Sequence, residues 1–120
     1  MAAIKRVAPG FPVRDLETAF AHYRRLGFAT RAYAGGGYGF LTRDDVELHL
    51  GVVPHVDNTG AKHTTYLYVD DADALAEEWS AAGVAVHKPV DTEWGQHEGA
   101  VVDPDGNVIR FGSPMAQSDR

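Results

Sequence analysis

The sequence predicts an α+β fold of two tandem βαβββ modules, whose strands form a curved mixed sheet around a concave cleft. Two observations support this prediction. The segment Val13-Arg14-Asp15-Leu16 is matched 56 residues later by Val69-Asp70-Asp71-Ala72. The segment Glu47-Leu48-His49-Leu50 is matched 61 residues later by Val108-Ile109-Arg110-Phe111. A repeated supersecondary unit indicates that two copies bury a core that one copy is too small to bury alone.

Each repeat contains one predicted helix of about eleven residues, judged by its apolar spacing. An aspartate, Asp15 or Asp71, stands where it can accept hydrogen bonds from the N–H groups of the first helical turn. A glycine, Gly27 or Gly83, suits the left-handed position just after a helix. Trp79 falls on the apolar stripe of the second helix, so we expect it to lie in the core.

Strand-like segments flank the two helices, separated by turn signals rich in glycine and aspartate. One strand ends at Val13 and another at Val69, each just before a helix. After the helices we expect strands at 28–34, 38–43 and 46–53 in the first half, and at 84–88, 99–103 and 108–112 in the second. The change of offset from 56 to 61 predicts a longer connection at 91–96, within a hydrophilic loop at 91–98.

The length of 120 residues predicts a single domain. Within it we expect module one at 1–53, a polar linker at 54–62, module two at 63–113 and a short C-terminal tail at 114–120. Two prolines in the segment 7–12 suit an edge strand or an exchanged strand, because proline cannot donate to a sheet ladder.

Composition narrows the functional classes. The formal net charge is −6, which disfavours binding to the phosphate backbone of nucleic acid and favours cationic small molecules. Cysteine is absent, so thiolate metal sites and cysteine nucleophiles are excluded. The sequence shows no apolar run typical of a transmembrane helix or a signal peptide, which makes the cytoplasm the expected location and a membrane partner unexpected.

The repeat, together with its flanking motifs, resembles the vicinal oxygen chelate superfamily over nearly the whole chain. The most specific short motif is Asp103-Pro104-Asp105-Gly106-Asn107, directly before the last expected strand. This superfamily includes glyoxalases, extradiol dioxygenases and antibiotic-binding resistance proteins. The resemblance therefore implies the fold more strongly than it implies a chemistry.

Within this superfamily the sequence is most similar to bleomycin resistance proteins. The segments that carry the similarity are Arg43-Asp44-Asp45-Val46, Asp57-Asn58-Thr59, Glu78-Trp79-Ser80 and Trp94-Gly95. The similarity implies metal-independent binding and sequestration of a bleomycin-type glycopeptide or a similar bulky aromatic antibiotic, with no catalytic residues and no cofactor. It also implies a homodimer, with an exchanged N-terminal strand as one form of it.

Metal-dependent members of the superfamily place ligands at four positions, which fall here near Ala8, Thr64, His49 (or Glu47) and Arg110. Alanine cannot bind a metal, and the permanent charge of Arg110 repels a cation. We therefore expect no metal site. One alternative is a glyoxalase-like or dioxygenase-like enzyme with a metal bound by His49, Glu47 and His63. Another is a binding module for a different hydrophobic metabolite.

A binding site for a flat ligand needs aromatic walls and a few polar anchors. The expected ligand-binding residues are Tyr38, Phe40, His49, Asn58, Thr59, Tyr66, Tyr68, Trp94, Gly95 and Arg110. Several have a second interpretation: Trp94 as a local loop anchor, and Tyr66 and Tyr68 as ordinary packing in the sheet. Arg110 is expected either to pair with Glu47 or to donate to ligand carbonyls. Glu98 is expected to be one of several acidic loop residues.

Overall fold

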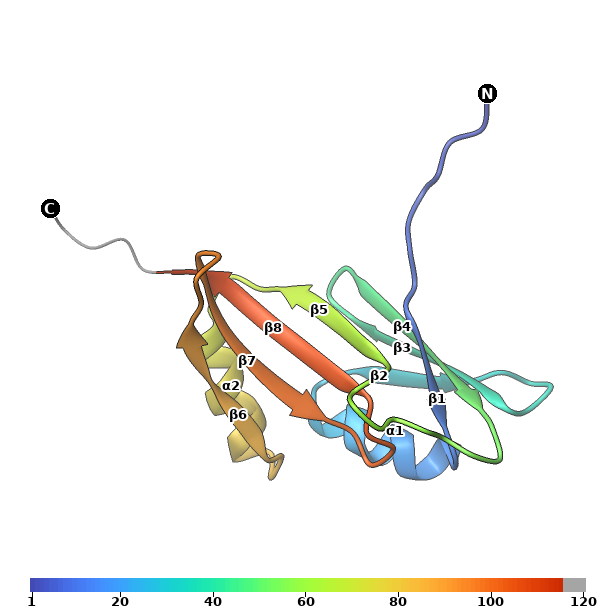
Figure 1. Ribbon diagram of the computed structural model, residues 1–120. Helices are drawn as coiled ribbons and strands as arrows, with labels where there is room; N and C mark the ends of the chain where they lie inside the picture. Colours follow the sequence, from blue (N-terminus) through green and yellow to red (C-terminus); the bar gives the residue numbers. More distant parts are fainter. Residues whose placement is uncertain (116–120) are drawn as a thin grey trace, which may run out of the picture. The chain divides into compact units, whose positions relative to one another are not determined.

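The computed structural model describes residues 1–115 and contains two four-stranded sheets and two helices (Figure 1). The chain divides into two compact units, Met1–Asp57 and a second unit that begins at Asn58. Each unit has the order strand, helix and three strands, as the repeat predicts. The predicted α+β fold with two tandem βαβββ modules is therefore confirmed, and each module forms a mixed sheet of its own.

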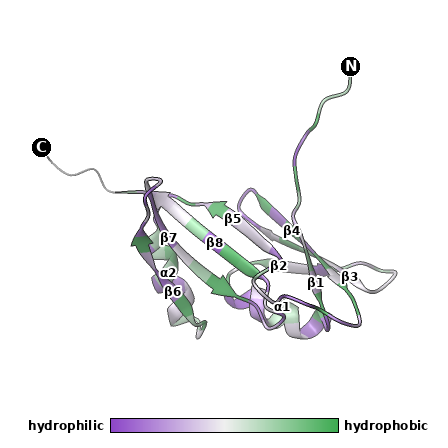
Figure 2. Ribbon diagram, viewed as in Figure 1, coloured by the Kyte–Doolittle hydropathy of each residue, from purple (hydrophilic) through white to green (hydrophobic). Residues whose placement is uncertain are grey.

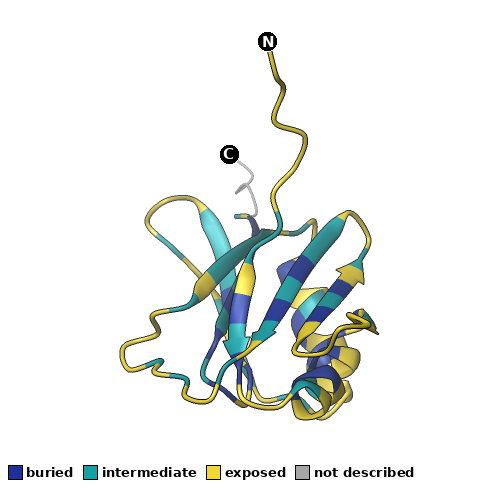
Figure 3. Cartoon of the chain, turned by 90° about the vertical axis from the view of Figure 1, so that its right-hand side faces the viewer, coloured by how far each residue is buried: buried dark blue, intermediate teal, exposed yellow. Residues whose placement is uncertain are grey.

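The first unit comprises β1 (Gly10–Val13), α1 (Leu16–Arg25), β2 (Ala29–Ala32), β3 (Tyr38–Arg43) and β4 (Val46–Val52). Its strand order is β1-β4-β3-β2, and β1 runs parallel to β4 at the edge of the sheet. Buried and more exposed residues alternate along β4, as Figure 3 shows for several strands. The buried side chains form one core face; they include Phe20, Tyr23, Leu48 and Leu50.

The second unit comprises β5 (Thr64–Tyr68), α2 (Ala72–Ala81), β6 (Val86–Asp91), β7 (Gln96–Val102) and β8 (Val108–Pro114), in the order β5-β8-β7-β6. Trp79 is 1% exposed, so the prediction that it lies in the core is confirmed. Its ring meets Phe111 edge to face at 5.0 Å. A Cβ on Gly99 would lie 2.6 Å from the Phe111 ring, so only glycine at this position avoids a clash with that ring.

The helix ends follow the sequence signals. The Thr18 N–H donates to Asp15 at 2.9 Å and the Ala74 N–H donates to Asp71 at 3.0 Å, so both aspartates are N-caps. The φ angles at Gly27 (+84°) and Gly83 (+89°) are left-handed, as the C-terminal signals predict.

The prediction of a long hydrophilic loop at 91–98 is wrong. Strand β6 continues to Asp91 and β7 begins at Gln96, so only residues 92–95 turn the chain. Expected strands 84–88 and 99–103 are correspondingly displaced. The extra residues lengthen the β6–β7 hairpin, with a register shift between His87 and Val90. The strands of this hairpin are difficult to predict from sequence because β6 is an edge strand with little buried surface, so its residues show no apolar alternation.

The N-terminal residues 1–9 contain no strand, although the sequence suggested one from residue 7. They leave the first sheet as an extended arm in which two basic residues, Lys5 and Arg6, stand between apolar residues (Figures 1 and 2). Ile4 and Val7 are 98% and 82% exposed. At the other end, most of the expected tail, residues 116–120, lies outside the described residues. Within residues 1–115 no helix is long and apolar enough to cross a membrane.

Candidate functional site

Each sheet has one face covered by its helix and one face turned away from it. In the first unit a Cβ on Gly39 would meet Phe20 and Leu16 of α1, so Gly39 and Leu41 point toward the helix. Their neighbours in sequence point the other way. The first-unit face is defined here as Tyr38, Phe40, Glu47 and His49, which lie on the side of the sheet opposite α1.

A chain of hydrogen bonds crosses the first-unit face and reaches the N-terminal arm. Arg6 Nη1 donates to Glu47 Oε1 at 2.6 Å, and Glu47 Oε2 lies 2.5 Å from His49 Nε2. The other imidazole nitrogen, Nδ1, is 2.9 Å from the Tyr38 hydroxyl. The bonds from His49 and then from Arg6 hold the pKa of Glu47 below its usual value. Glu47 therefore stays ionised and orients His49, which orients Tyr38.

Phe40 adds a second aromatic ring to the same face. Its ring meets His49 edge to face at 5.0 Å and Tyr38 at 5.5 Å. The Arg31 guanidinium stands 4.1 Å from the centre of the Phe40 ring, within the range of a cation–π contact. The structure therefore brings together the three predicted ligand-binding residues of the first unit, Tyr38, Phe40 and His49.

The second-unit face is defined here as Tyr66, Tyr68, Glu98 and Arg110. Because Phe111 points toward α2, its neighbour Arg110 points away, and the register places Tyr66 beside Arg110. Arg110 Nε and Nη2 both donate to Glu98 Oε2, at 3.0 and 2.6 Å. The predicted pairing of Arg110 with Glu47 is therefore wrong. The prediction that Glu98 is a loop charge is also wrong, because Glu98 lies in β7 and its side chain is only 13% exposed.

Aromatic rings flank the Arg110 guanidinium. Its carbon atom lies 5.5 Å from the centre of the Tyr66 ring and 6.0 Å from that of Trp94. The Tyr66 and Tyr68 rings are 4.9 Å apart, and Tyr68 is 82% exposed. This exposure argues against ordinary sheet packing for Tyr68, whereas Tyr66 is half-buried.

Three oxygen atoms near this face are buried and have no hydrogen-bond partner among residues 1–115. They are the Tyr66 hydroxyl, Gln96 Oε1 and Glu98 Oε1. Burial raises the pKa of the Tyr66 hydroxyl, and the neighbouring Glu98 carboxylate acts in the same direction. Tyr66 is therefore a neutral hydroxyl, able to donate as well as accept.

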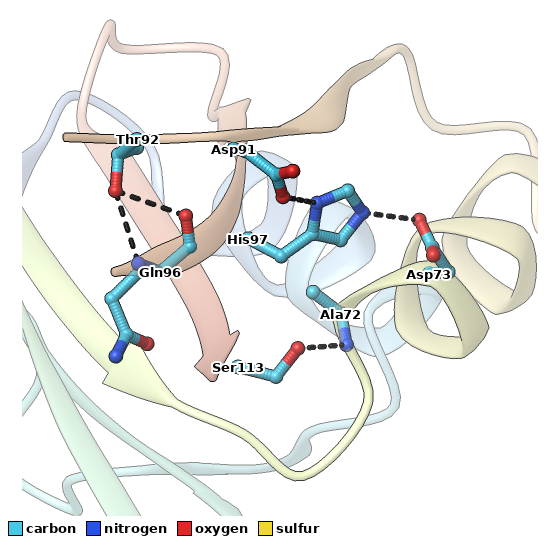
Figure 4. Close-up of polar contacts among 7 residues, drawn as sticks. All are labelled: Ala72, Asp73, Asp91, Thr92, Gln96, His97 and Ser113. Carbon is cyan, nitrogen blue, oxygen red and sulfur yellow. Dashed lines mark hydrogen bonds and ion pairs between the residues drawn. The ribbon is translucent and has the colours of Figure 1, made fainter. Parts of the chain in front are cut away.

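Trp94 stands at the tip of the β6–β7 hairpin. Polar contacts between Thr92 and Gln96 hold this turn (Figure 4). The Thr92 hydroxyl donates to the Gln96 carbonyl at 2.9 Å and accepts from the Gln96 N–H at 3.1 Å. Gly95 supplies a left-handed φ of +87°. Because these contacts hold the turn without the indole, and Trp94 is 63% exposed, its ring is not a local anchor.

A second polar cluster fixes the base of this hairpin. His97 Nδ1 lies 2.9 Å from Asp91, and His97 Nε2 lies 2.8 Å from Asp73 at the start of α2 (Figure 4). The bonds to Asp73 and then to Asp91 raise the pKa of His97. Sequence reasoning missed this cluster, because Asp73 lies far from the other two residues in sequence, and Asp91 and His97 fell in the supposed loop.

Residues 3–111 match the family model of the Glyoxalase/Bleomycin resistance protein/Dioxygenase superfamily. The chain belongs to this superfamily. A bleomycin resistance protein from Klebsiella pneumoniae is 29% identical over 114 residues, which cover 88% of this chain and 90% of the relative. Among solved structures, a bleomycin-binding protein in complex with bleomycin has a TM-score of 0.83 at 28% sequence identity. The match covers 93% of this chain and 100% of that protein chain.

A further solved structure is the bleomycin-binding protein of bleomycin-producing Streptomyces verticillus, in complex with copper(II)-bleomycin. It has a TM-score of 0.81 at 25% identity and covers 96% of this chain and 100% of its own. The likeness extends along both modules, so the family assignment covers each of the two faces described above.

The remaining predicted site residues of this superfamily member lie in loops. Asn58 Nδ2 donates to the Asp105 carbonyl at 2.7 Å and to Asn107 Oδ1 at 3.0 Å, so its side chain fastens the β7–β8 turn. Thr59 follows it and is exposed, and Gly95 serves the hairpin turn.

The residues of the alternative metal site fall in different units. Glu47 and His49 contact each other in the first unit, whereas His63 precedes β5 in the second. Among the described residues there is no group of three or more His, Cys, Asp or Glu side chains that could hold a metal ion.

Proposed function

We propose that this protein binds and sequesters a bleomycin-type glycopeptide or a similar bulky aromatic antibiotic, without a metal of its own and without chemical change to the drug, and so confers resistance. The observation that carries the proposal is Trp94. It is a large aromatic side chain, 63% exposed, at the tip of a hairpin that is fixed by other residues. A preorganised exposed ring loses little conformational freedom when a flat ligand stacks on it.

Each unit has a face with further groups that suit such a ligand. The second-unit face offers the Tyr66 and Tyr68 rings and the Arg110 guanidinium beside Trp94. The first-unit face offers Tyr38, Phe40 and His49. We propose all seven as ligand-binding residues. Asn58, Thr59 and Gly95 are proposed to shape the surrounding loops.

The relatives support the antibiotic class. One is named a bleomycin resistance protein, and two solved structures hold bleomycin or copper(II)-bleomycin. The net charge of −6 also favours the approach of a cationic drug. Resistance of this kind is stoichiometric, because each bound drug molecule is kept from its target while it stays bound.

The proposal includes a homodimer in the cytoplasm. Strand β1 is an edge strand, and the arm before it exposes Ile4 and Val7. An exposed apolar arm next to a sheet edge suits exchange with a second copy. Sedimentation velocity of the full chain measures the dimer, and cell fractionation checks the location.

The experiment is a titration of chelator-treated protein with metal-free bleomycin, followed by tryptophan fluorescence. We expect saturable quenching at one drug per chain. Because Trp94→Ala removes the exposed fluorophore, binding to the variants is measured by isothermal titration calorimetry. Trp94→Ala is expected to weaken binding by about 30-fold or more, the loss typical of a central aromatic in an interface. Tyr33→Ala is the matched control, because Tyr33 is also an exposed aromatic next to a hairpin turn but belongs to no proposed face.

No saturation at high micromolar drug would reject bleomycin as the ligand. Binding that appears only when a divalent metal is restored to the protein, with metal-free drug, would reject metal independence. Equal losses in Trp94→Ala and Tyr33→Ala would reject the assignment of Trp94.

A further inference from the structure

In the Arg110–Glu98 ion pair, the arginine is more exposed to solvent than the glutamate. The Arg110 side chain is 40% exposed, whereas that of Glu98 is 13% exposed. A guanidinium has five N–H donors, and two of them, on Nε and Nη2, point to Glu98 Oε2. The other three have no hydrogen-bond acceptor among residues 1–115. A ligand that approaches this face therefore meets hydrogen-bond donors, not the carboxylate.

The charge of those donors is already balanced. Glu98 lies 2.6 Å from the guanidinium, so the pair is neutral as a unit. A ligand carboxylate would have to compete with Glu98 for Arg110 and would approach a second anion at close range. A neutral carbonyl oxygen can accept from the remaining N–H groups without disturbing the pair.

The surroundings of Arg110 favour a flat ligand group. The guanidinium lies within reach of the Tyr66 and Trp94 rings, at 5.5 and 6.0 Å. A planar group on the exposed Trp94 ring can stack on the indole while its substituent lies beside Arg110. The geometry thus selects a planar group whose acceptor lies at its edge.

We infer that the second-unit face selects a neutral planar group with a carbonyl acceptor, such as an aromatic carboxamide, over a carboxylate of the same shape, and that Glu98 sets this preference. Arg110 is the ligand-binding residue, and Glu98 is a positioning residue that also neutralises it. The inference rests on the proposed function in one respect, that a ligand occupies this face.

The test uses two probes of matched shape, naphthalene-2-carboxamide and 2-naphthoate. Binding is measured from the indole N–H signal of Trp94 in NMR spectra, with the buried Trp79 signal as an internal reference for folding. We expect the wild-type protein to bind the carboxamide about five-fold more tightly than the carboxylate, the scale of one hydrogen-bond difference.

Glu98→Gln is expected to reverse this order, because Arg110 then has an unbalanced positive charge that favours the carboxylate. A purely structural role for Glu98 would weaken both probes equally. The matched control is Glu93→Gln, which removes the same charge from the exposed neighbour of Trp94 and should leave the order unchanged. A second variant, the double substitution Glu98→Gln with Arg110→Met, removes both charges of the pair and is expected to bind both probes within about two-fold of each other.

An unchanged order in folded Glu98→Gln would overturn the inference, and so would a reversal in Glu93→Gln. If Glu98→Gln does not fold, a persistent preference for the carboxamide in the folded double variant Glu98→Gln with Arg110→Met overturns it instead. Failure of both probes to shift the wild-type Trp94 signal overturns it as well. If the probe experiments fail but the protein still binds bleomycin, the inference is rejected and the proposed function stands. If the probes show the expected selectivity but bleomycin does not bind, the inference stands and only bleomycin is rejected as the ligand.

Discussion

The Tyr66 hydroxyl lies directly over Gly112 on the neighbouring strand. A Cβ at residue 112 would stand 2.1 Å from the Tyr66 hydroxyl oxygen and 3.1 Å from the ring carbon that bears it. Gly51 holds the corresponding position of the first sheet, 61 residues earlier, and a Cβ there would stand 3.7 Å from the Tyr38 ring, at ordinary contact distance. A Cβ at residue 112 would therefore force the Tyr66 side chain to move, whereas one at residue 51 would leave Tyr38 in place.

The substitution Gly112→Ala is predicted to displace the Tyr66 ring. We expect a loss of about 1–3 kcal/mol of unfolding free energy from overpacking, together with weaker ligand binding on the second-unit face. Gly51→Ala is the control and should change stability by less than about 0.5 kcal/mol. Urea denaturation of both variants measures the difference. Equal stability of the two variants would contradict this account of Gly112.

Ser113 is predicted to hold the start of α2. Its hydroxyl accepts a hydrogen bond from the Ala72 N–H at 3.0 Å, and both residues are buried. Ser113→Ala leaves that N–H without an acceptor, so we expect a loss of about 1–3 kcal/mol. Ser80→Ala, on the exposed side of the same helix, should have little effect. Thermal unfolding followed by circular dichroism compares them, and an unchanged midpoint for Ser113→Ala would refute the prediction.

The parts of the fold that sequence predicted well are those with local signals. The helix boundaries follow from Asp15, Asp71, Gly27 and Gly83, each of which acts on its own turn of backbone. The strands of the β6–β7 hairpin carry no such signal, although Gly95 marks the turn between them. The edge strand, β6, buries little surface and so shows no apolar alternation. Which residues of β7 pair with β6 is known only from the strand register in the structure.

The same distinction explains the site. Aromatic residues such as Trp94 stand out in a polar stretch and can be identified from sequence alone. The partner of Arg110 cannot, because Glu98 reaches it only through the antiparallel pairing of β7 with β8, which sets Ala100 beside Arg110 and Glu98 beside Gly112. Polar pairs that form across strands depend on register, and a shift of one residue moves a side chain to the other face.

The two tryptophans are predicted to behave in opposite ways. Trp79 is 1% exposed and Trp94 is 63% exposed. Acrylamide should quench the emission of Trp94 and leave that of Trp79 nearly unquenched. Trp94→Phe should therefore abolish most quenching with a stability change below about 0.5 kcal/mol, whereas Trp79→Ala should cost about 3–5 kcal/mol. Strong quenching that persists in Trp94→Phe would show that Trp79 is not in the core.

His97 is predicted to make stability depend on pH near neutrality. Its bonds to Asp73 and Asp91 raise its pKa above the ordinary value of 6.5. The protonated ring donates to both carboxylates, whereas the neutral ring has one N–H and can donate to only one. The stabilisation is therefore complete below pH 6.5 and is lost as the pH rises through the raised pKa.

The size of this effect should stay below about 1 kcal/mol, because both carboxylates are largely exposed. The measurement is denaturant unfolding of the wild-type protein and His97→Gln from about pH 5.5 to about pH 8.5. The difference in unfolding free energy between them should shrink as the pH rises, because the comparison isolates the contribution of His97. His55→Gln, an exposed histidine, should follow the wild-type curve. A His97→Gln difference that is constant with pH would mean that His97 contributes through packing and not through its charge.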